Sequence, residues 1–560
     1  MYKQKYDMWL NSTYVDEATK TKLLNIDNER EIEDRFYKDL EFGTGGLRGV
    51  LGTGSNRMNL YTVGKATQGI ADYLLHSTVK NPSVSIAYDS RIMSKEFAQR
   101  VSEILCANGI KVNLFESLRP TPVASYTVSH LKSTLGIVIT ASHNPKQYNG
   151  YKVYGEDGGQ ITDKLADDIY SAICNVDDFS KVKIIEFDKA IKFGLLSIIG
   201  EEVDKTYIDK VKSLTVRKKF VEEHASELKI IYTPIHGSGN IPVRRVLKEL
   251  GYENLHVVKE QEKPDGNFPT TSSPNPENRE VFNLALELAK EIQPDIIFGT
   301  DPDCDRIGVV VKDESGEYRV LTGNQIGALL THYMLSALKE ENSLPKNAAI
   351  IKTIVTTDLA KKISSDFDVE LIEVLTGFKY IGEKIKEFEE TKSNTFILGF
   401  EESYGYLAGT FVRDKDAVIA ASLISEMALW HKLKGKSLYD ALIDLYIKYG
   451  YYKEELVSIT LEGKEGMETI NKIMTALRGT RIFEDDAVEL LDYSKGIGGL
   501  PRPNVFKFKF SSDDWFVVRP SATEPKIKMY YSVKGCNMQE IEDKCNKLKN
   551  DVACIIKKLI

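Results

Sequence analysis

Four apolar runs along this chain each end in a cluster of polar side chains, and this recurrence limits the possible folds more than any other feature. "LGIVIT" leads into "ASHNP", "DIIFGT" into "DPDCDR", "NTFILGF" into "EESYG", and "DWFVVRP" into "SATEP". Each run has the length and composition of a buried strand, and successive runs are a small domain apart. Because loops at strand ends are held by a rigid scaffold, we expect four domains that each present one loop to a shared cleft.

The segments before and between these runs indicate α/β domains. "SVSIAYDS" precedes the helical pattern "EFAQRVSEILCANG", and "LKIIYTPIHG" precedes "IPVRRVLKELG". Such alternation of short apolar strands and amphipathic helices is typical of α/β folds. The first 40 residues have the pattern of charged helices, and strand alternation replaces helical periodicity near residue 450. The predicted domains are 1–205, 206–318, 319–450 and 451–560.

Composition narrows the class of protein. The chain has 560 residues, too many for one core. With 74 basic and 82 acidic residues, it has no general excess of positive charge for nucleic acid or membrane surfaces. Its six cysteines form no CxxC pair or disulfide framework, which suits a reducing compartment. The N-terminus lacks a signal-peptide core, and no apolar run has the length of a membrane span. We therefore expect a cytoplasmic protein with neither nucleic acid nor a membrane as partner.

The loop "GTDPDCDRIG" places three carboxylates at alternate positions. Asp301, Asp303 and Asp305 repel one another at this spacing unless a cation lies among them, and hard oxygen ligands suit Mg²⁺. A solvated acidic turn is an alternative, as is a phosphatase with an aspartyl nucleophile, which also uses DxD after a strand. A calcium EF-hand fits poorly, because Arg306 and Lys312 occupy the positions of its glycine and glutamate.

The loop "TASHNP" places Ser142 beside His143. Ser142 is not on a GxSxG elbow, and adjacent side chains in an extended loop usually diverge, so we expect no serine–histidine relay. A serine can instead carry a phosphoryl group whose oxygens bind Mg²⁺. Lys152 lies ten residues on, where it would balance that charge or move a proton. An ordinary capped turn is the alternative interpretation.

The remaining loops offer groups suited to a sugar phosphate. "RPSATEPKIK" contains Arg519, Ser521, Thr523 and Lys528. A forked cation with hydroxyls in a turn makes a good phosphate cradle. The acids and hydroxyl of "GFEESYGY" suit the diol of a sugar, and Arg48 lies among glycines that let a backbone approach an anion. By itself, a loop like "RPSATEPKIK" is more commonly a surface turn, the acids of "GFEESYGY" fit a helix N-terminus equally well, and the loop around Arg48 fits a flexible turn equally well.

The whole ordered set resembles the α-D-phosphohexomutase superfamily. The serine loop, DxDxDR, EESYG and RPSxTEP occur in that order, and the resemblance covers essentially the whole chain. "DRFYKDLEFGTGGLRG", "NRMN", "YTPIHG" and "PDGNFPT" are similar to the longer phosphoglucomutase branch, which includes phosphopentomutase-like members. The resemblance implies three similar α/β domains with mixed sheets, plus a smaller C-terminal α+β domain, around a central cleft.

The resemblance also implies a mechanism. Ser142 would carry the phosphoryl group, pass it to a sugar monophosphate, and recover the other phosphate after the bisphosphate turns over in the cleft. Mg²⁺ would be held by a phosphoserine oxygen and by Asp301, Asp303 and Asp305. The family's proton-transfer and charge-stabilising positions match Lys152, His143 and Arg48. Arg306 would face the phosphoserine, and the "SATEP" loop would hold the phosphate that does not react.

Substrate residues follow from the same resemblance. "LTGFKY" is similar to the loop of glucose-specific members, with Thr376, Gly377 and Phe378 in the matching positions. Glu401 and Ser403 match the pair that holds sugar hydroxyls, and Lys415 matches another substrate-binding lysine. The dual mannose/glucose branch has a histidine shortly after that serine, whereas "YGY" follows here, which favours glucose. One departure is Ala522, where the family usually has glycine.

We therefore expect a Mg²⁺-dependent phosphoglucomutase that interconverts glucose 1-phosphate and glucose 6-phosphate, with glucose 1,6-bisphosphate as intermediate and primer. Phosphopentomutase and phosphomannomutase activities are alternatives within the family. A hydrolase that releases phosphate and a silent sugar-phosphate-binding protein are alternatives from other classes. The sequence leaves the oligomeric state and the phosphorylation state of Ser142 open.

Overall fold

The structure is a computed structural model that describes residues 2–43, 45–461, 463–479, 487–497, 500–520 and 526–559. Three helices lead the chain: α1 (Tyr2–Asn11), α2 (Glu17–Leu24) and α3 (Glu29–Phe36). They close around a small aromatic core that includes Trp9 and Phe36, whose rings meet edge to face. The expectation of helices in the first 40 residues is confirmed.

The first sheet has the order β1-β2-β6-β5-β3-β4-β7. Its strands are β1 (Phe42–Gly43), β2 (Gly46–Val50), β3 (Ser83–Tyr88), β4 (Lys111–Phe115), β5 (Leu135–Ile139), β6 (Tyr148–Tyr154) and β7 (Leu196–Ile199). The helices are α4 (Leu60–His76), α5 (Ser94–Ala107), α6 (Thr121–His130), α7 (Asp163–Cys174) and α8 (Phe187–Lys192), with a 3₁₀ turn at Phe179–Lys181. Strands β3, β4 and β5 are parallel and contribute mostly apolar side chains to the core, as is typical of strands covered by helices on both faces.

The second sheet has the order β12-β11-β10-β8-β9. Its strands are β8 (Ile230–Thr233), β9 (Leu255–Val257), β10 (Ile296–Thr300), β11 (Ile307–Lys312) and β12 (Tyr318–Leu321). Its helices are α9 (Glu201–Ser213), α10 (Lys218–His224), α11 (Asn240–Glu249), α12 (Lys259–Glu262) and α13 (Asn283–Ile292), with 3₁₀ turns at Ala225–Glu227 and Arg279–Phe282.

The third sheet has the order β14-β13-β15-β16. Its strands are β13 (Ala348–Thr353), β14 (Glu370–Val374), β15 (Thr395–Glu401) and β16 (Gly405–Ala408). Its helices are α14 (Gly323–Glu340), α15 (Leu359–Asp366), α16 (Phe378–Thr391), α17 (Ala417–Lys432) and α18 (Leu438–Tyr449). Capping boxes begin α14 and α18. The side chains of Thr322 and Ser437 each accept a hydrogen bond from the backbone N–H of the third helical residue, and the side chain of that residue accepts one from the backbone N–H of Thr322 or Ser437.

One four-stranded unit recurs in all three sheets. Two parallel strands stand beside a central strand, and an antiparallel strand lies on its other side: β4-β3-β5-β6, β9-β8-β10-β11, and β14-β13-β15-β16. In each copy, the loop that joins the central strand to its antiparallel partner carries a polar cluster found in the sequence. The prediction of three similar α/β domains with mixed sheets is confirmed.

The C-terminal sheet is antiparallel throughout, with the order β17-β21-β20-β19-β18. Its strands are β17 (Tyr451–Thr460), β18 (Ala487–Asp492), β19 (Phe506–Phe510), β20 (Trp515–Pro520) and β21 (Lys526–Gly535). Helices α19 (Gly463–Gly479) and α20 (Met538–Leu559) cover it, and a 3₁₀ turn spans Tyr493–Lys495. This confirms the predicted C-terminal α+β domain.

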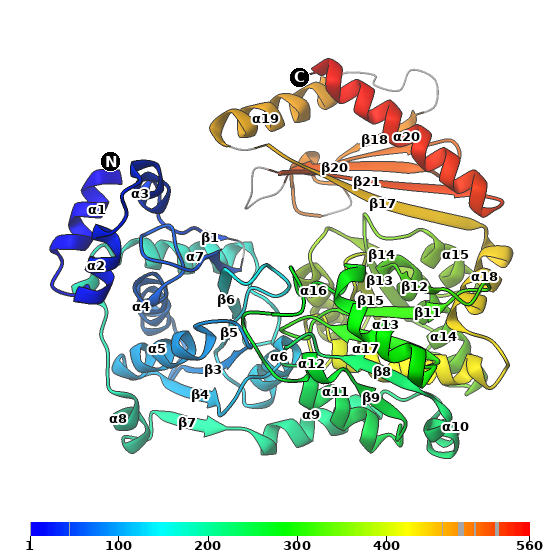
Figure 1. The fold of residues 1–560 in the computed structure, drawn as a ribbon, viewed down its shortest axis with the longest axis horizontal. Coiled ribbons are helices and arrows are strands. Elements are labelled where there is room, and N and C mark those ends of the chain that lie inside the picture. Colours follow the sequence, from blue (N-terminus) through cyan, green and yellow to red (C-terminus); the bar gives the residue numbers. More distant parts are fainter. Residues whose placement is uncertain are drawn as a thin grey trace.

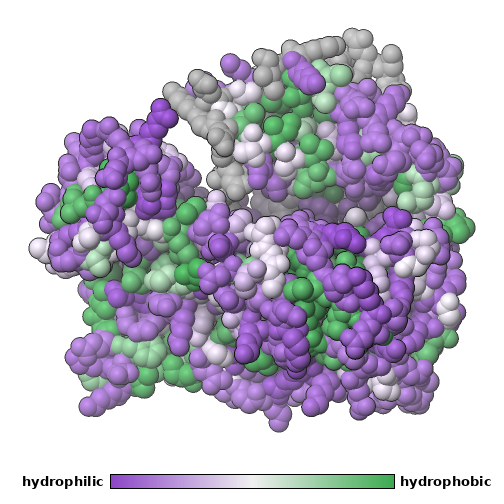
Figure 2. All heavy atoms as spheres, in the orientation of Figure 1, coloured by the Kyte–Doolittle hydropathy of each residue, from purple (hydrophilic) through white to green (hydrophobic). Residues whose placement is uncertain are grey.

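The four sheets stand around an indentation. In Figure 1 the N-terminal lobe lies to the left of the second and third sheets and the C-terminal sheet lies above them, and Figure 2 shows the surface hollowed between these two lobes. The C-terminal sheet rests on the third domain through Trp515, whose Nε1 donates to Asp358 at 3.0 Å. Among the described residues, no helix has the length and apolar character needed to cross a bilayer.

The domain boundaries at residues 205, 318 and 450 remain predictions, and β12 spans the second of them.

Candidate active site

Ser142 lies in the loop between β5 and β6, and its hydroxyl points at the acidic loop of the second domain. Ser142 Oγ donates to Asp301 Oδ2 at 2.7 Å, and the residue is only 4 % exposed. The backbone at Ser142 is left-handed, with φ of 52°, a conformation that a residue with a Cβ adopts only when its surroundings hold it there. Part of that support is a 2.8 Å hydrogen bond from Ser142 N to Thr140 Oγ1.

The left-handed turn also brings His143 against the serine. His143 Nδ1 lies 3.3 Å from Ser142 Oγ, so the expectation that these adjacent side chains diverge is wrong. That expectation assumed an extended loop, and the positive φ at Ser142 turns the two side chains to the same side. Burial, reinforced by the positive charges of Arg306 and Arg48, holds the pKa of His143 well below its usual range. His143 is therefore a neutral imidazole beside the serine.

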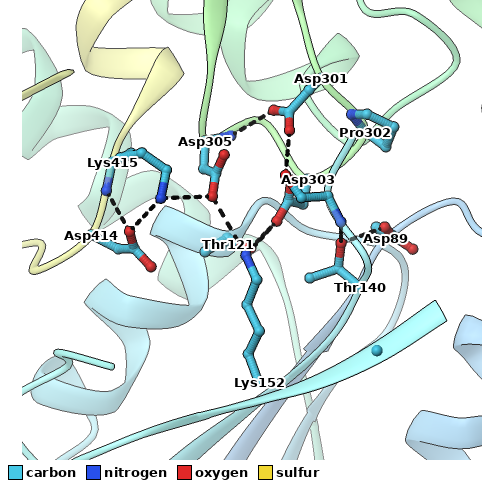
Figure 3. Close-up of polar contacts among 12 residues, drawn as sticks. Asp89, Thr121, Thr140, Lys152, Asp301, Pro302, Asp303, Asp305, Asp414 and Lys415 are labelled. Atoms are coloured by element: carbon cyan, nitrogen blue, oxygen red, sulfur yellow. Dashed lines mark hydrogen bonds and ion pairs between the residues drawn. The ribbon is translucent and has the colours of Figure 1, made fainter. Parts of the chain in front are cut away.

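The three aspartates of the loop between β10 and β11 form a compact acidic cluster. Asp301, Asp303 and Asp305 are at most 2 % exposed, and each can place a carboxylate oxygen within 4.8 Å of the others. Lys152 Nζ on β6 lies 2.8 Å from Asp303 Oδ2 and 3.4 Å from Asp305 Oδ2, as Figure 3 shows. The interpretation as a solvated acidic turn is wrong, because these groups are buried between domains.

These carboxylates fit a hard cation. Asp303 Oδ1 and Asp305 Oδ1 are buried without a hydrogen-bond partner, and such atoms are costly unless something binds them. Burial and the charges of Asp303 and Asp305 raise the pKa of Asp301 well above its usual range. A divalent cation would remove both penalties, and the all-oxygen donor set suits Mg²⁺.

Two further cations border the acidic cluster. Lys415, between β16 and α17, brings its Nζ within 3.2 Å of Asp305 Oδ2 and 3.9 Å of Glu401 Oε1 (Figure 3 shows the first contact). Arg306 Nη1 pairs with Glu277 Oε1 at 2.7 Å. Together with the contacts of Lys152, they join residues of the first three domains in one charged network.

Arg48 lies on β2, next to the strand that carries Lys152. Its Nη1 donates to Asn144 Oδ1 at 3.1 Å, so the Arg48 side chain contacts the serine loop.

The predicted sugar-binding residues come from two loops of the third domain. Glu401 ends β15, and burial raises its pKa to about 7 despite the nearby Lys415 ammonium. Ser403 follows in the turn between β15 and β16. Gly377, with φ of 120°, is the N-cap residue of α16, and the ring centroid of Phe378 lies 5.5 Å from Lys415 Nζ.

The C-terminal domain contributes Arg519 and Lys528. They are directly opposite each other on β20 and β21. Arg519 Nη1 donates to Thr376 Oγ1, which ties this hairpin to the sugar loop. Burial and the charge of Arg519 lower the pKa of Lys528, as expected for two cations held together without an anion. The predicted Ser521 and Thr523, and Ala522 between them, lie outside the described residues.

Several residues around the site carry no signal in the sequence. Thr121, the first residue of α6, donates to Asp303 Oδ2 at 2.8 Å, and Tyr154 donates to Asp414 Oδ2 at 2.7 Å. Arg91, after β3, donates to the serine-loop carbonyls of Ser142 and Pro145. These partners lie in domains or loops remote in sequence, so no local spacing announces them.

Three family descriptions match: phosphoglucomutase/phosphomannomutase alpha/beta/alpha domain I over residues 39–179, domain II over 205–316, and domain III over 322–449. A curated protein named phosphoglucomutase from Staphylococcus haemolyticus is 36% identical over 549 residues, covering 96% of this chain and 97% of that protein. A phosphoglucomutase from Staphylococcus aureus is 37% identical over 533 residues, covering 92% and 94%.

Solved structures agree on the fold. Parafusin, a phosphoglucomutase from Paramecium in an open form, superposes with a TM-score of 0.69 at 17% identity, covering 93% of this chain and 95% of that one. A phosphoglucomutase/phosphomannomutase family protein from Burkholderia thailandensis superposes with a TM-score of 0.67 at 18% identity, covering 92% and 97%.

Proposed function

Because this chain belongs to the phosphoglucomutase/phosphomannomutase family, a family of mutases, we propose that it interconverts glucose 1-phosphate and glucose 6-phosphate. The observation that carries the proposal is the contact between Ser142 Oγ and Asp301. It joins the one serine hydroxyl expected to carry phosphate to a buried acidic cluster that fits Mg²⁺. The names of the curated relatives support glucose over other sugars.

In the proposed reaction, phosphoserine 142 transfers its phosphoryl group to the free hydroxyl of the sugar monophosphate. The bond between phosphorus and the serine oxygen breaks as the sugar oxygen bonds to phosphorus, and in the net step the proton lost by the sugar hydroxyl is replaced by one gained by the serine oxygen, which leaves Ser142 as a free hydroxyl. The product is glucose 1,6-bisphosphate, which also serves as primer for the unphosphorylated enzyme. After it turns over, the other phosphate returns to Ser142 and the opposite monophosphate leaves.

The chain's own residues supply positioning and charge. His143 is neutral and lies 3.3 Å from Ser142 Oγ, where it can exchange a proton with the serine. Lys152, Arg306 and Arg48 place positive charge around the serine loop, which stabilises charge that spreads over the transferring group. Asp301, Asp303 and Asp305, with an oxygen of the phosphoserine, would hold Mg²⁺, which neutralises phosphate charge when bound.

The remaining predicted residues bind substrate in this proposal. Glu401, Ser403 and Lys415 would receive the sugar hydroxyls, and the 376–378 loop would border them. Arg519 and Lys528 would hold the phosphate that does not react, together with the 521–525 loop. A clamp in a separate domain can hold either end of the bisphosphate, as the reorientation requires. We place the protein in the cytoplasm, where sugar phosphates are its small-molecule partners.

A substrate panel tests the proposal. Glucose 1-phosphate, mannose 1-phosphate and ribose 1-phosphate would each be incubated with Mg²⁺ and a trace of the matching bisphosphate, and products followed by phosphorus NMR. We expect glucose 1-phosphate to isomerise fastest with little inorganic phosphate. Faster ribose or mannose turnover would keep the mechanism and overturn the choice of sugar. Release of inorganic phosphate alone would identify a hydrolase.

A further inference from the structure

Arg91 is a buried residue that donates hydrogen bonds to the backbone of the serine loop between β5 and β6. The residue is 3 % exposed, and its guanidinium donates to the carbonyl oxygens of four loop residues. Nε donates to Ser142 O at 3.2 Å, and Nη1 donates to Pro145 O and Tyr148 O, both at 3.1 Å. Nη2 donates to Ser142 O and Asn144 O. These five hydrogen bonds use the five N–H groups of a planar guanidinium. A lysine ammonium has only three N–H groups on one nitrogen and cannot form the same set.

These bonds fix the strained part of the loop. Ser142 has a left-handed backbone, and its carbonyl receives two N–H groups of Arg91. Asp89 orients the arrangement from the other side, because it accepts from Arg91 N at 2.9 Å and from Thr140 Oγ1 at 2.6 Å. Arg91 therefore binds the backbone of the residue whose left-handed conformation points Oγ toward Asp301.

A segment of the second domain, residues 263–273, closes over Arg91. The ring centroid of Phe268 lies 5.1 Å from the Arg91 guanidinium carbon, and Phe268 is buried with φ of 46°. Gly266 touches domain I so closely that a Cβ would lie 2.4 Å from Ile92 N. Ser273 Oγ donates to His143 O at 3.2 Å. The segment thus contacts both Arg91 and the serine loop.

His236 anchors that segment beside the aspartate loop. Its Nδ1 lies 3.1 Å from Lys263 O and its Nε2 lies 3.0 Å from Thr270 Oγ1. Two residues on, Ser238 donates to Pro302 O through both N and Oγ, each at 2.8 Å. His236 and Ser238 therefore connect the segment over Arg91 to the loop that carries Asp301. The "YTPIHG" motif supplies His236 and the "PDGNFPT" motif supplies Phe268 and Thr270, and the proposed chemistry gives these three residues no other task.

We propose that Arg91 is the positioning residue that sets Ser142 against the aspartate loop, and that residues 263–273, anchored by His236, couple this support to the second domain. Neither Arg91 nor His236 touches the reacting atoms in this proposal. They act through the serine loop and the aspartate loop. The kinetic part of the inference rests on the proposed function, whereas its structural part does not.

The test compares Arg91→Lys, His236→Asn and the double variant. The control is Arg100→Lys, which changes an arginine of α5 that pairs with Glu103 at 3.1 Å. One readout is the rate at which unphosphorylated enzyme takes phosphate from glucose 1,6-bisphosphate, followed by intact mass. The other is hydrogen–deuterium exchange of peptides covering 140–150. Calorimetry of glucose 6-phosphate binding separates lost positioning from lost binding.

We expect Arg91→Lys to slow phosphorylation roughly 100-fold while sugar-phosphate affinity changes little, because misplaced reacting groups cost rate rather than binding. Exchange in 140–150 should rise in this variant and not in Arg100→Lys. His236→Asn should slow phosphorylation roughly 10-fold, and the double variant should be less impaired than the product of the two effects.

Unchanged exchange in 140–150 in Arg91→Lys would overturn the positioning role, and simple multiplication of the two rate effects would overturn the coupling. If Arg91→Lys fails to fold, Phe268→Leu replaces it, because it removes only the ring that covers the guanidinium. A wild-type enzyme that takes no phosphate would contradict the proposed function, while the exchange measurement would still decide the positioning role.

Discussion

The hydroxyl of Ser142 donates a 2.7 Å hydrogen bond to Asp301, although the two residues are 159 positions apart in the chain. Each residue stands at the same place in its own domain, in the loop between the central strand of the sheet and its antiparallel neighbour. Two copies of one structural unit thus meet through equivalent loops.

Ser142→Ala should abolish mutase turnover while leaving glucose 6-phosphate binding intact, because only the phosphoryl carrier is removed. Phosphorus NMR measures turnover, and calorimetry measures binding. Ser129→Ala, which changes an exposed serine of α6, is the matched control and should keep full activity. Retained turnover in Ser142→Ala would contradict the phosphoserine assignment.

Asp303→Asn should weaken Mg²⁺ binding and lower kcat, with a loss of roughly 100-fold or more at fixed Mg²⁺. The physical reason is that Asp303 offers an unpartnered oxygen to the cation, and the amide replaces one charged ligand by a neutral one. Activity against Mg²⁺ concentration measures the shift. Glu287→Gln removes an exposed acid that pairs with Lys290 and should follow the wild-type curve. Full activity of Asp303→Asn without added Mg²⁺ would count against the site.

Lys528→Gln should raise KM for glucose 1-phosphate roughly 10- to 100-fold, the scale of one charged hydrogen bond of about 1.5–3 kcal/mol. Lys528 stands opposite Arg519 in a half-buried position that lowers its pKa, so an anion should bind there with little loss of hydration. Initial rates over a substrate series give KM. Lys534→Gln alters the same strand near Asp513 and should leave KM unchanged. Equal KM values for both variants would remove Lys528 from the phosphate site.

Glu401→Gln should stabilise the ligand-free protein at pH 8 but not at pH 4. Burial raises the pKa of Glu401 from 4.5 to about 7, so the folded state holds this proton more tightly than the unfolded state. Its contribution to stability is present below pH 4.5 and is lost as pH rises through 7. The gain at pH 8 should be about 1–3 kcal/mol. Urea unfolding at both pH values measures it.

Glu387→Gln, which changes an exposed acid of α16, should alter stability equally little at both pH values. A stability gain in Glu401→Gln that is the same at pH 4 and pH 8 would contradict the titration of Glu401. Glu401→Gln should also lower kcat/KM, because the carboxylate that we propose binds the sugar loses its charge.

Much of the site could be predicted from its sequence. Strand runs that end in "ASHNP", "DPDCDR" and "EESYG" identify the loops, since both the strand and its polar end are local patterns. The relation of Ser142 to His143 could not be predicted, because it depends on a left-handed backbone that the letters "ASHNP" do not announce. Thr121 and Arg91 were missed because their partners lie in other loops or domains.

By itself, then, the sequence determined the units of this protein: strands, helices, capping residues and the chemistry at each strand end, all of which depend on neighbours a few residues away. The tertiary structure alone decided which groups meet. The hydroxyl of Ser142 reaches Asp301, and Arg519 reaches Thr376, only after domains have packed. The physical reason is that burial and charge pairing act through space, so the pKa of His143 and the unpartnered oxygens of Asp303 and Asp305 exist only in the folded assembly.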